Sequence, residues 1–348
     1  MHARIDAMRS PRVGVDRFRG ARNALIVGVA ASTLSISARS LGAQTGTESG
    51  GGVDLLLPTG ARSIGMGQAV AAAATGADAL WWNPALIVGA GRQVGMNIGK
   101  LLAISTDAGA SVIIPFRRAF TVGLGVRYID EGQEDATFFD PNAPTGTFDI
   151  STVVVAASFA APFGDRFAAG FTAKVLRVNF ACTGACNTNA PGGTPSTQAL
   201  DLGAQYYVFR DSSLSVGATV RDAGFRLQIN DAPQADPLPT RFEAGVLYRP
   251  RFAQLPADQR VLAAADIVTR TSGGGAPGFR IGGEWSWQER VEARLGYLVN
   301  GPIAAQSGAT IGAGFAAGKW QIDVAQLLID SGGLGGGPPT FISLRYAF

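Results

Sequence analysis

Residues 60–88 read GARSIGMGQAVAAAATGADALWWNPALIV, and the rest of the chain is organised around this stretch. Its glycines allow backbone conformations that are closed to other residues. Pro84 disfavours the helical conformation at Asn83, and the alanines at 71–74 are small enough to pack tightly or to form a short helix. The stretch is therefore a poor strand and a poor regular helix, and we expect a compact, irregular segment.

The first 43 residues have the layout of a secretory signal peptide. Arginines are frequent in residues 1–23, an apolar stretch follows at 24–38, and small residues precede Gln44. The apolar stretch is shorter than the roughly 20 residues that a membrane-spanning helix needs. We therefore expect cleavage after Ala43, export through the inner membrane, and two mature regions, at 44–90 and 91–348.

Loss of this leader changes the charge of the chain and the chemistry that it can carry. The leader holds seven of the 29 basic and two of the 26 acidic residues, which leaves 22 basic and 24 acidic residues. The basic isoelectric point thus belongs to the leader and does not indicate binding of nucleic acid. The only histidine, His2, is also lost, and with it the usual triad base and a common metal ligand. We expect no enzyme activity, no cofactor and no metal site.

Alternating apolar and polar residues beyond residue 91 predict fourteen strands. Odd connections, such as 131–146 and 181–196, are mostly long, whereas even ones, such as 163–165 and 288–289, are mostly short. Long loops at one end and tight turns at the other are typical of outer-membrane barrels. The first connection, near Ile104, and the eighth, 250–258, depart from the alternation. The predicted strands are 92–102, 107–115, 119–130, 147–161, 166–180, 197–209, 212–223, 240–249, 259–270, 278–287, 290–299, 307–316, 319–329 and 340–348.

The predicted strands near the carboxyl end have one apolar and one polar face. Trp320 and Ile322, for example, alternate with Gln321 and Asp323. An Arg or Lys that faces the bilayer midplane costs roughly 2–4 kcal/mol, so the charged face must be the lumen. Outward aromatic residues then become candidates for the interfacial girdles, namely Tyr128, Tyr248, Trp285, Trp287, Tyr297, Trp320 and Tyr346. The predicted lumen charges, either a structural salt-bridge network or a functional cluster, are Arg127, Arg241, Glu243, Asp266, Arg280, Glu284, Glu292, Arg294, Asp323 and Arg345.

The two cysteines, Cys182 and Cys186, are only four positions apart. In an exported protein this spacing favours a small disulfide that staples a long loop. Two thiols without a histidine are too few for a zinc site. A redox-active pair is the least favoured reading, because no strand–helix context surrounds the motif.

The stretch at 60–88 resembles the amino-terminal hatch of FadL-type outer-membrane barrels, and is most similar to the PorV/PorQ branch. The resemblance continues at 238–246, at 280–285 followed by 293–297, at 311–315 with 322–325, and at 334–335 followed by 342–344, and it is sparse between 105 and 235. Two departures are Gln68, where the family often has glycines, and the Trp81-Trp82 step. The resemblance implies an all-β fold, a fourteen-stranded antiparallel transmembrane β-barrel in the cell outer membrane, with an N-terminal hatch plugging the lumen. The hatch motif residues are Gly60, Arg62, Gly65, Gly67, Trp82, Asn83, Pro84 and Ala85.

The resemblance implies a barrel that binds or passes hydrophobic small molecules, with capture at the loop side, a hatch in the lumen and lateral exit. The alternative is a PorV-like accessory or carrier protein of type IX secretion, whose partner is a secreted cargo protein. Residues 343–348 resemble the terminal signal read by the barrel-assembly machinery, and outer-membrane lipid is an expected partner.

Two finer expectations concern single motifs. Residues 312–317 match a dinucleotide fingerprint by letter, but no helix follows to receive a pyrophosphate, so relief of crowding within a strand explains these glycines. The amide of Asn83 can donate and accept hydrogen bonds at once. We expect it to hold the hatch by contacting lumen charges such as Arg280, Glu284, Arg294 and Arg345.

Overall fold

The computed structural model describes residues 51–101, 105–117, 119–137, 145–185, 194–228, 235–251, 255–270, 276–300, 307–328 and 337–348. The predicted signal peptide at 1–43 and Cys186 lie outside the described residues. The short helices are η1 (Val53–Leu56), α1 (Ala61–Gly65), η2 (Gly76–Asp78), α2 (Ala79–Trp82) and η3 (Pro84–Gly89). The strands are β1 (Gln93–Lys100), β2 (Thr106–Phe116), β3 (Phe120–Ala136), β4 (Gly146–Phe163), β5 (Phe167–Gly184), β6 (Ser196–Tyr207), β7 (Leu214–Gly224), β8 (Arg241–Tyr248), β9 (Gln259–Arg270), β10 (Gly278–Trp287), β11 (Val291–Val299), β12 (Gly308–Ala317), β13 (Trp320–Leu328) and β14 (Thr340–Ala347).

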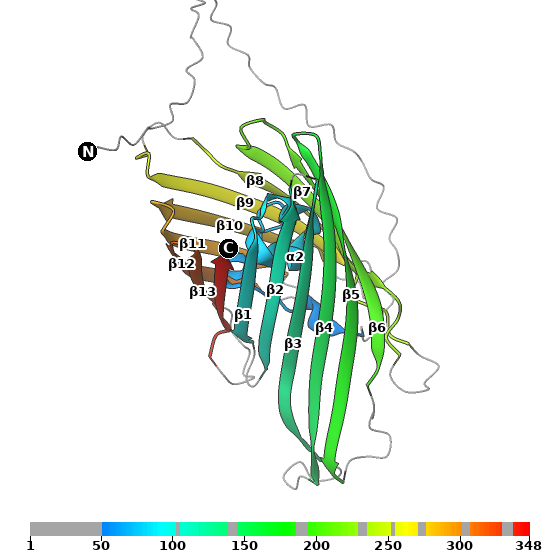
Figure 1. Cartoon of the computed structure of the whole chain (residues 1–348). Helices are drawn as coiled ribbons and strands as arrows, with labels where there is room; N and C mark the ends of the chain where they lie inside the picture. The colour runs from blue at the N-terminus through cyan, green and yellow to red at the C-terminus, as the bar shows by residue number, and fades with distance from the viewer. Residues whose placement is uncertain are drawn as a thin grey trace, which may run out of the picture. The chain divides into compact units, whose positions relative to one another are not determined.

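The strands form one closed antiparallel barrel in which each pairs with its neighbours in sequence and β1 pairs with β14 (Figure 1). The closing ladder runs from Gln93 opposite Ala347 to Lys100 opposite Thr340. Closure leaves no unpaired sheet edge, which is what a sheet needs in order to cross a bilayer. The predicted all-β, fourteen-stranded antiparallel barrel is confirmed. Within the described residues, no helix combines the length and the apolar character that crossing a membrane requires.

Strands β3, β4 and β5 extend furthest beyond their predicted ranges. The sequence pattern placed loops at 131–146 and 181–196, but β3 continues to Ala136 and β5 to Gly184. Beyond a register shift after Asp130, residues 133–136 pair with 146–149 of β4. Figure 1 shows β3, β4 and β5 as the longest arrows. The prediction failed here because residues 131–136 are mostly polar and residues 181–184 are small, so backbone pairing forms the strands without an apolar alternation.

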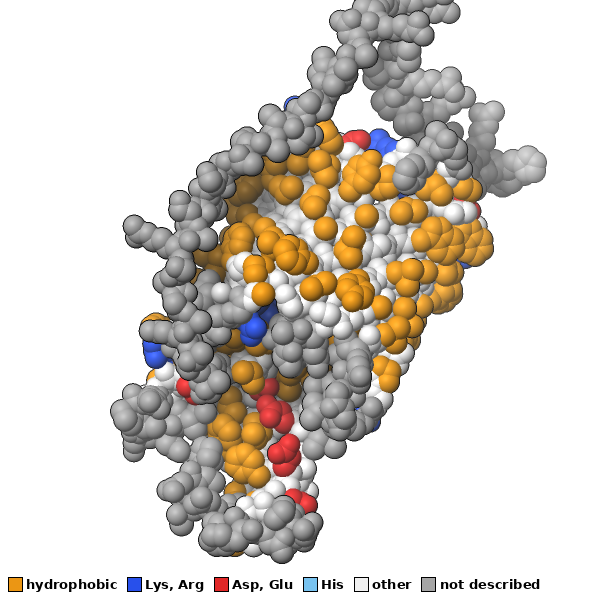
Figure 2. Space-filling view, turned by 180° about the vertical axis from the view of Figure 1, so that it is seen from behind, with side chains coloured by type: hydrophobic (Ala, Val, Ile, Leu, Met, Phe, Trp, Pro, Cys, Tyr) orange, Lys and Arg blue, Asp and Glu red, His pale blue; other side chains and the backbone are white. Residues whose placement is uncertain are grey.

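The outward face of the barrel is apolar. In β13, Trp320, Ile322 and Val324 are exposed, whereas Asp323 and Ala325 between and beyond them are buried. Figure 2 shows hydrophobic side chains spread over the described surface seen from behind. Because an apolar outer face must meet lipid, the charged face is the lumen. Six of the proposed girdle residues are exposed on the outside, and Tyr346 packs against Trp320 with ring centroids 4.5 Å apart.

The two ends of the barrel differ, as the connection lengths predict. The even connections include the tight turns at 164–166, 288–290 and 318–319, and the longer eighth connection at 249–258. We call this end the turn side and the opposite end the loop side. The barrel is therefore oriented by its own connections, with the loop side expected outside the cell and the turn side in the periplasm.

Candidate functional site

Residues 54–90, which we call the hatch segment, lie inside the ring of strands. Their main chain bonds to inward side chains from widely separated strands. The N–H of Ala61 donates to Ser343 Oγ of β14 (2.7 Å), and the N–H of Ala71 donates to Asp266 Oδ2 of β9 (2.7 Å). On another side, Ser111 Oγ of β2 donates to the carbonyl of Ala77 (3.2 Å). The segment therefore spans the lumen from wall to wall.

Glycines on both partners let the hatch segment approach the wall. Gly67 follows α1 with a φ of 62°, and a Cβ there would lie 2.5 Å from the carbonyl oxygen of Ile281. On the wall, a Cβ on Gly282 would lie 2.2 Å from the carbonyl oxygen of Met66. A Cβ on Gly296, which pairs with Gly282, would lie 2.2 Å from the nitrogen of Gly67. Because both backbones meet here, neither side tolerates a side chain.

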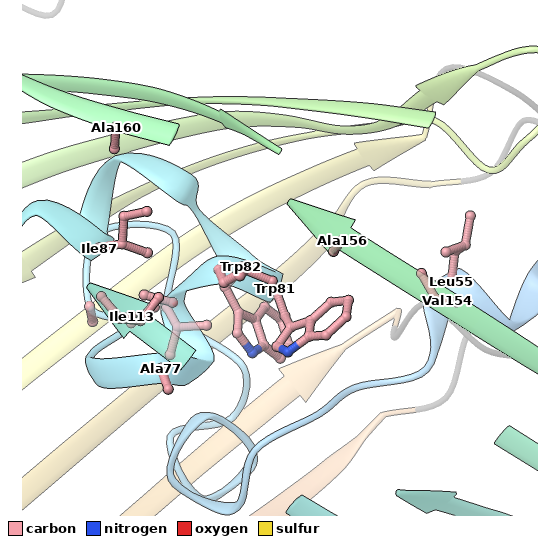
Figure 3. Packing of buried hydrophobic residues seen from close by; sticks show 14 of the residues in the cluster. Leu55, Ala77, Trp81, Trp82, Ile87, Ile113, Val154, Ala156 and Ala160 are labelled. Carbon is pink, nitrogen blue, oxygen red and sulfur yellow. The ribbon is translucent and has the colours of Figure 1, made fainter. Parts of the chain in front are cut away.

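Apolar side chains of the hatch segment form the centre of the largest buried cluster. Figure 3 shows the rings of Trp81 and Trp82 side by side, with Ile87 and Ile113 on one side of them and Leu55 on the other. Aromatic side chains bury more surface than most other residue types, so the two tryptophans contribute strongly to the stability of this cluster.

Trp82 also has polar partners. Its Nε1 donates to the carbonyl of Thr59 (3.0 Å). The guanidinium carbons of Arg221 and Arg280 lie 4.9 and 6.0 Å from the Trp82 ring centroid. These cation–π contacts add to the attraction between the hatch segment and the wall. The sequence pattern did not indicate them, because Trp82 and the two arginines are far apart along the chain.

The expectation that Asn83 contacts lumen charges is wrong. Its Nδ2 donates to the carbonyls of Ala71 (2.6 Å) and Ala204 (3.2 Å), and its Oδ1 accepts from the N–H of Ala85 (3.1 Å). Asn83 thereby caps η3, which begins at Pro84, and ties the hatch segment to itself and to β6. Asn83 can approach the backbone of β6 this closely because Gly203 beside it has no side chain. A Cβ on Gly203 would lie 2.1 Å from Asn83 Oδ1.

Substituting Asn83→Ala should loosen the hatch segment. The side chain is fully buried, and its loss leaves two carbonyls and one N–H without their partner. A net cost of roughly 1–3 kcal/mol is expected for such a change. In planar-bilayer recordings the variant should flicker between closed and open levels, while the parent stays closed. Gly89→Ala is the matched control, since an added Cβ there meets no atom within 4 Å. Equal recordings for both variants would contradict the assignment.

Eight of the ten predicted lumen charges fall into two groups and one outlier. In the first group Arg294 bonds Glu284 (2.7 Å) and Asp323 (2.7 Å), and also contacts Glu292. In the second group Glu243 lies 3.4 Å from Arg241 and 3.5 Å from Arg280. The two groups share no ion pair among the described residues. Arg345 belongs to neither and donates to Gln321 Oε1. Of the other two predicted lumen charges, Arg127 pairs with Asp107 (2.9 Å), and Asp266 accepts from Ala71.

Arginines of the wall also donate hydrogen bonds to the main chain of the hatch segment. Arg241 donates to the carbonyl of Leu55 (2.7 Å), Arg127 to that of Leu57 (3.2 Å) and Arg280 to that of Gln68 (3.3 Å). From the hatch side, Arg62 pairs with Glu284 (2.9 Å) and donates to the carbonyl of Ala73 (2.8 Å). Guanidinium groups offer five donors, so one side chain can bind a carboxylate and a carbonyl together.

Three of the buried charges that the sequence analysis missed form one group. Lys174 Nζ lies 2.6 Å from Asp201 and 2.7 Å from Asp222, and Asp222 also accepts from Arg241 (3.2 Å). Asp222 has a φ of 58°, opposite a register shift between Leu200 and Leu202. Because of this bulge the consecutive residues Arg221 and Asp222 are both buried. In a regular strand one of the two would face outward, so the alternating pattern did not predict both in the lumen.

Asp78 is the acidic residue of the hatch segment nearest the turn side. Burial raises the pKa of its carboxyl, while a hydrogen bond from Asn97 Nδ2 (2.9 Å) acts in the opposite direction. The neighbouring Gly60 has a φ of 83°, and a Cβ there would lie 2.5 Å from Asp78 Oδ2. Asp78 therefore sits in a space that only glycine leaves open.

The described residues contain no group of three or more acidic, Cys or His residues that could hold a metal ion. The predicted disulfide of Cys182 with Cys186 stays a prediction, because only Cys182, near the end of β5, is described.

Comparison with known proteins points to one group of folds. No family model and no curated protein sequence matches the chain. Among solved structures, the toluene transporter TodX of Pseudomonas putida has a TM-score of 0.57 at 11% identity, covering 84% of this chain and 99% of TodX. The CymD monoaromatic hydrocarbon channel has a TM-score of 0.55 at 14% identity, covering 84% of this chain and 98% of CymD. A Pseudomonas aeruginosa FadL homologue has a TM-score of 0.53 at 13% identity, covering 84% of this chain and 99% of the homologue.

The chain has the fold of the FadL-type outer-membrane channels. These neighbours are channels and transporters rather than enzymes. Together with the apolar outer face, the FadL-type fold confirms the predicted location in the outer membrane.

Proposed function

We propose that the protein passes hydrophobic small molecules across the outer membrane through a lumen that the hatch segment closes. The observation that carries this proposal is the apolar lining of the lumen at the loop side. Ile129 of β3, Leu298 of β11, Leu327 of β13 and Phe341 of β14 are all buried and share the inward face with the lumen charges. A channel for polar solutes would present water-filled, polar walls at its entrance.

The hatch segment supports the same proposal. Ala61 and Ile64 of α1 pack in one apolar cluster with Leu101, Ala325 and Phe341. A hydrophobic molecule that enters from the loop side would therefore meet apolar side chains on both the wall and the hatch segment. At the same end of the barrel, Arg241 and Arg280 bind carbonyls of the hatch segment through hydrogen bonds, which can break and re-form.

The fold of the neighbours agrees with this class of cargo, since two of them are named for toluene and monoaromatic hydrocarbons. The finer resemblance to the PorV/PorQ branch rests on the motifs alone, and no contact among the described residues favours the carrier role in type IX secretion. We extend the proposal to export by the leader at 1–43, to residues 60–88 as the hatch, and to assembly through the terminal signal at 343–348.

Solute flux tests the proposal directly. Proteoliposomes that contain the protein should take up radiolabelled toluene faster than empty liposomes, with no matching rise for glucose, because apolar side chains line the loop-side lumen beside its paired charges. The hatch segment can be tied to the wall by the double substitution Ala61→Cys and Ser343→Cys, whose positions are joined by a 2.7 Å hydrogen bond. Oxidation of this pair should abolish toluene uptake, and a reductant should restore it.

The parent protein with and without reductant is the control for the native cysteines. Toluene uptake that equals that of empty liposomes would overturn the proposed function. A rise for glucose alone would also overturn it, and would indicate a polar pore.

A further inference from the structure

Arg345 of β14 differs from six of the other arginines at the lumen. Arg62, Arg127, Arg221, Arg241, Arg280 and Arg294 each have a carboxylate partner within 4.0 Å. Arg345 has none among the described residues, and its printed hydrogen bond goes to the amide oxygen of Gln321. Asp78 and Asp323 act on its charge from beyond 4.0 Å, and an anion bound directly beside this partly buried guanidinium would further reduce its desolvation cost.

Arg345 lines a cavity of about 320 Å³ at the turn-side rim of the barrel. The cavity lies between the end of the hatch segment and the last strands, and it is lined by Gly76, Gln93, Lys319 and Gln321 as well as Arg345. A Cβ on Gly91 or Gly318, which also line it, would meet no atom within 4 Å. The cavity is therefore open at these glycines and has room for a ligand.

The charges around the cavity leave its cations available. Lys319 is exposed in the turn between β12 and β13, with its Nζ 5.9 Å from the Tyr346 ring centroid. The nearby carboxylates are occupied by other donors: Asp78 by Asn97 (2.9 Å), Asp323 by Arg294 (2.7 Å), and Glu292 by Arg294 and Gln321. The two cations thus face the cavity without a committed acidic partner among the described residues.

Aromatic side chains flank the cavity. Trp320, which lines it, packs against Tyr346 on the outer surface. Trp and Tyr concentrate at the level of the headgroups in membrane proteins. One side of the cavity is formed by the outward Trp320 and the other by the inward Arg345, so a headgroup phosphate beside Trp320 could enter the cavity.

We propose that this cavity is a binding site for a phosphate group, carried either by a phospholipid of the periplasmic leaflet or by a free phosphate ion. The planar guanidinium of Arg345 matches phosphate oxygens in a bidentate geometry, and Lys319 adds a point charge. The site is independent of the proposed transport of hydrophobic molecules.

Isothermal titration calorimetry on the purified full-length barrel in a neutral detergent tests the site. The probes are a short-chain phosphatidylglycerol and inorganic phosphate, titrated separately. Lys319→Gln should weaken binding about five-fold, as one surface cation contributes roughly 1 kcal/mol towards an anionic lipid. Arg345→Gln should weaken it about ten-fold or more, since the bidentate partner is lost.

Two matched pairs separate a site from a general surface charge effect. Gly91→Asp places a carboxylate at the open wall and should weaken binding about as much as Arg345→Gln, whereas Gly91→Ser should change it less than about two-fold. Arg290→Gln removes an exposed cation from another turn of the same rim and should also change it less than about two-fold.

The two probes distinguish the source of the phosphate. Tight binding of the lipid with weak binding of inorganic phosphate identifies a lipid headgroup site, and comparable binding of both identifies a site for phosphate itself. Absence of binding for both probes, or an equal loss in Lys319→Gln and Arg290→Gln, would overturn the proposal. Lys319→Gln and Gly91→Asp keep the test decisive if Arg345→Gln does not fold.

Discussion

Deletion of residues 54–88 should convert the protein into a steadily conducting pore. The backbone ladder of the barrel closes between β1 and β14 without any contribution from the hatch segment, so the barrel should still assemble. The deleted residues are those that span the lumen and bond to Ser343, Asp266 and Ser111 of the wall. Planar-bilayer recordings should show a nearly closed parent and a deletion that stays open.

Assembly must be established separately from conductance. A closed barrel satisfies its backbone groups between strands and resists detergent, so unboiled and boiled samples of both proteins should migrate differently on a gel. Gly89→Ala, whose added Cβ meets no neighbour, should remain as closed as the parent. An assembled deletion that is as silent as the parent would show that another part of the chain closes the lumen.

Replacing Arg294 by Met should give the largest loss of stability of any single substitution considered for this protein. The side chain is fully buried and binds carboxylates from three strands, those of Glu284, Glu292 and Asp323. Removing one partner of a buried ion pair costs about 3–5 kcal/mol, because the remaining charges are left in a poor solvent. Urea unfolding in lipid vesicles, followed by tryptophan fluorescence, would measure the change in the free energy of unfolding.

Two further variants make this result specific. Arg294→Lys keeps one positive charge but loses the planar fork, so it should destabilise the barrel less than Arg294→Met. Arg260→Met breaks the pair with Glu289, whose side chains are 71% and 69% exposed, and should change the free energy of unfolding by less than about 1 kcal/mol. Similar losses for Arg294→Met and Arg260→Met would refute the role assigned to the buried group.

Much of the barrel could be read from the order of residues. The predicted ranges 259–270 and 278–287 are those of β9 and β10, and the charged face of β13 is the lumen face. These features are local: a strand in a bilayer must alternate between lipid and lumen, so a period of two is imprinted on it. The stretch at 60–88 also stands out, because its glycines and the Trp-Asn-Pro step form a continuous motif, and its role as a hatch stays a prediction.

The partners of the site residues were not readable in this way. Asn83 binds the main-chain carbonyls of Ala71 and Ala204. Every residue has such a carbonyl, so the sequence does not show which ones accept a hydrogen bond from Asn83. The bulge that buries Arg221 beside Asp222 depends on the register of two strands, which is set by the whole ladder. The same holds for the extended ends of β3 and β5, which only pairing across strands makes regular.

The sequence by itself therefore determined the class of fold and the faces of most strands. Only the tertiary structure decided which charges meet, dividing the predicted cluster around Arg294 and Glu243 and leaving Arg345 without a carboxylate among the described residues. The physical reason is the distance along the chain between the residues that interact. Alternation arises from neighbours along one strand, whereas ion pairs and hydrogen bonds in the lumen join residues whose proximity exists only once the barrel has closed around the hatch segment.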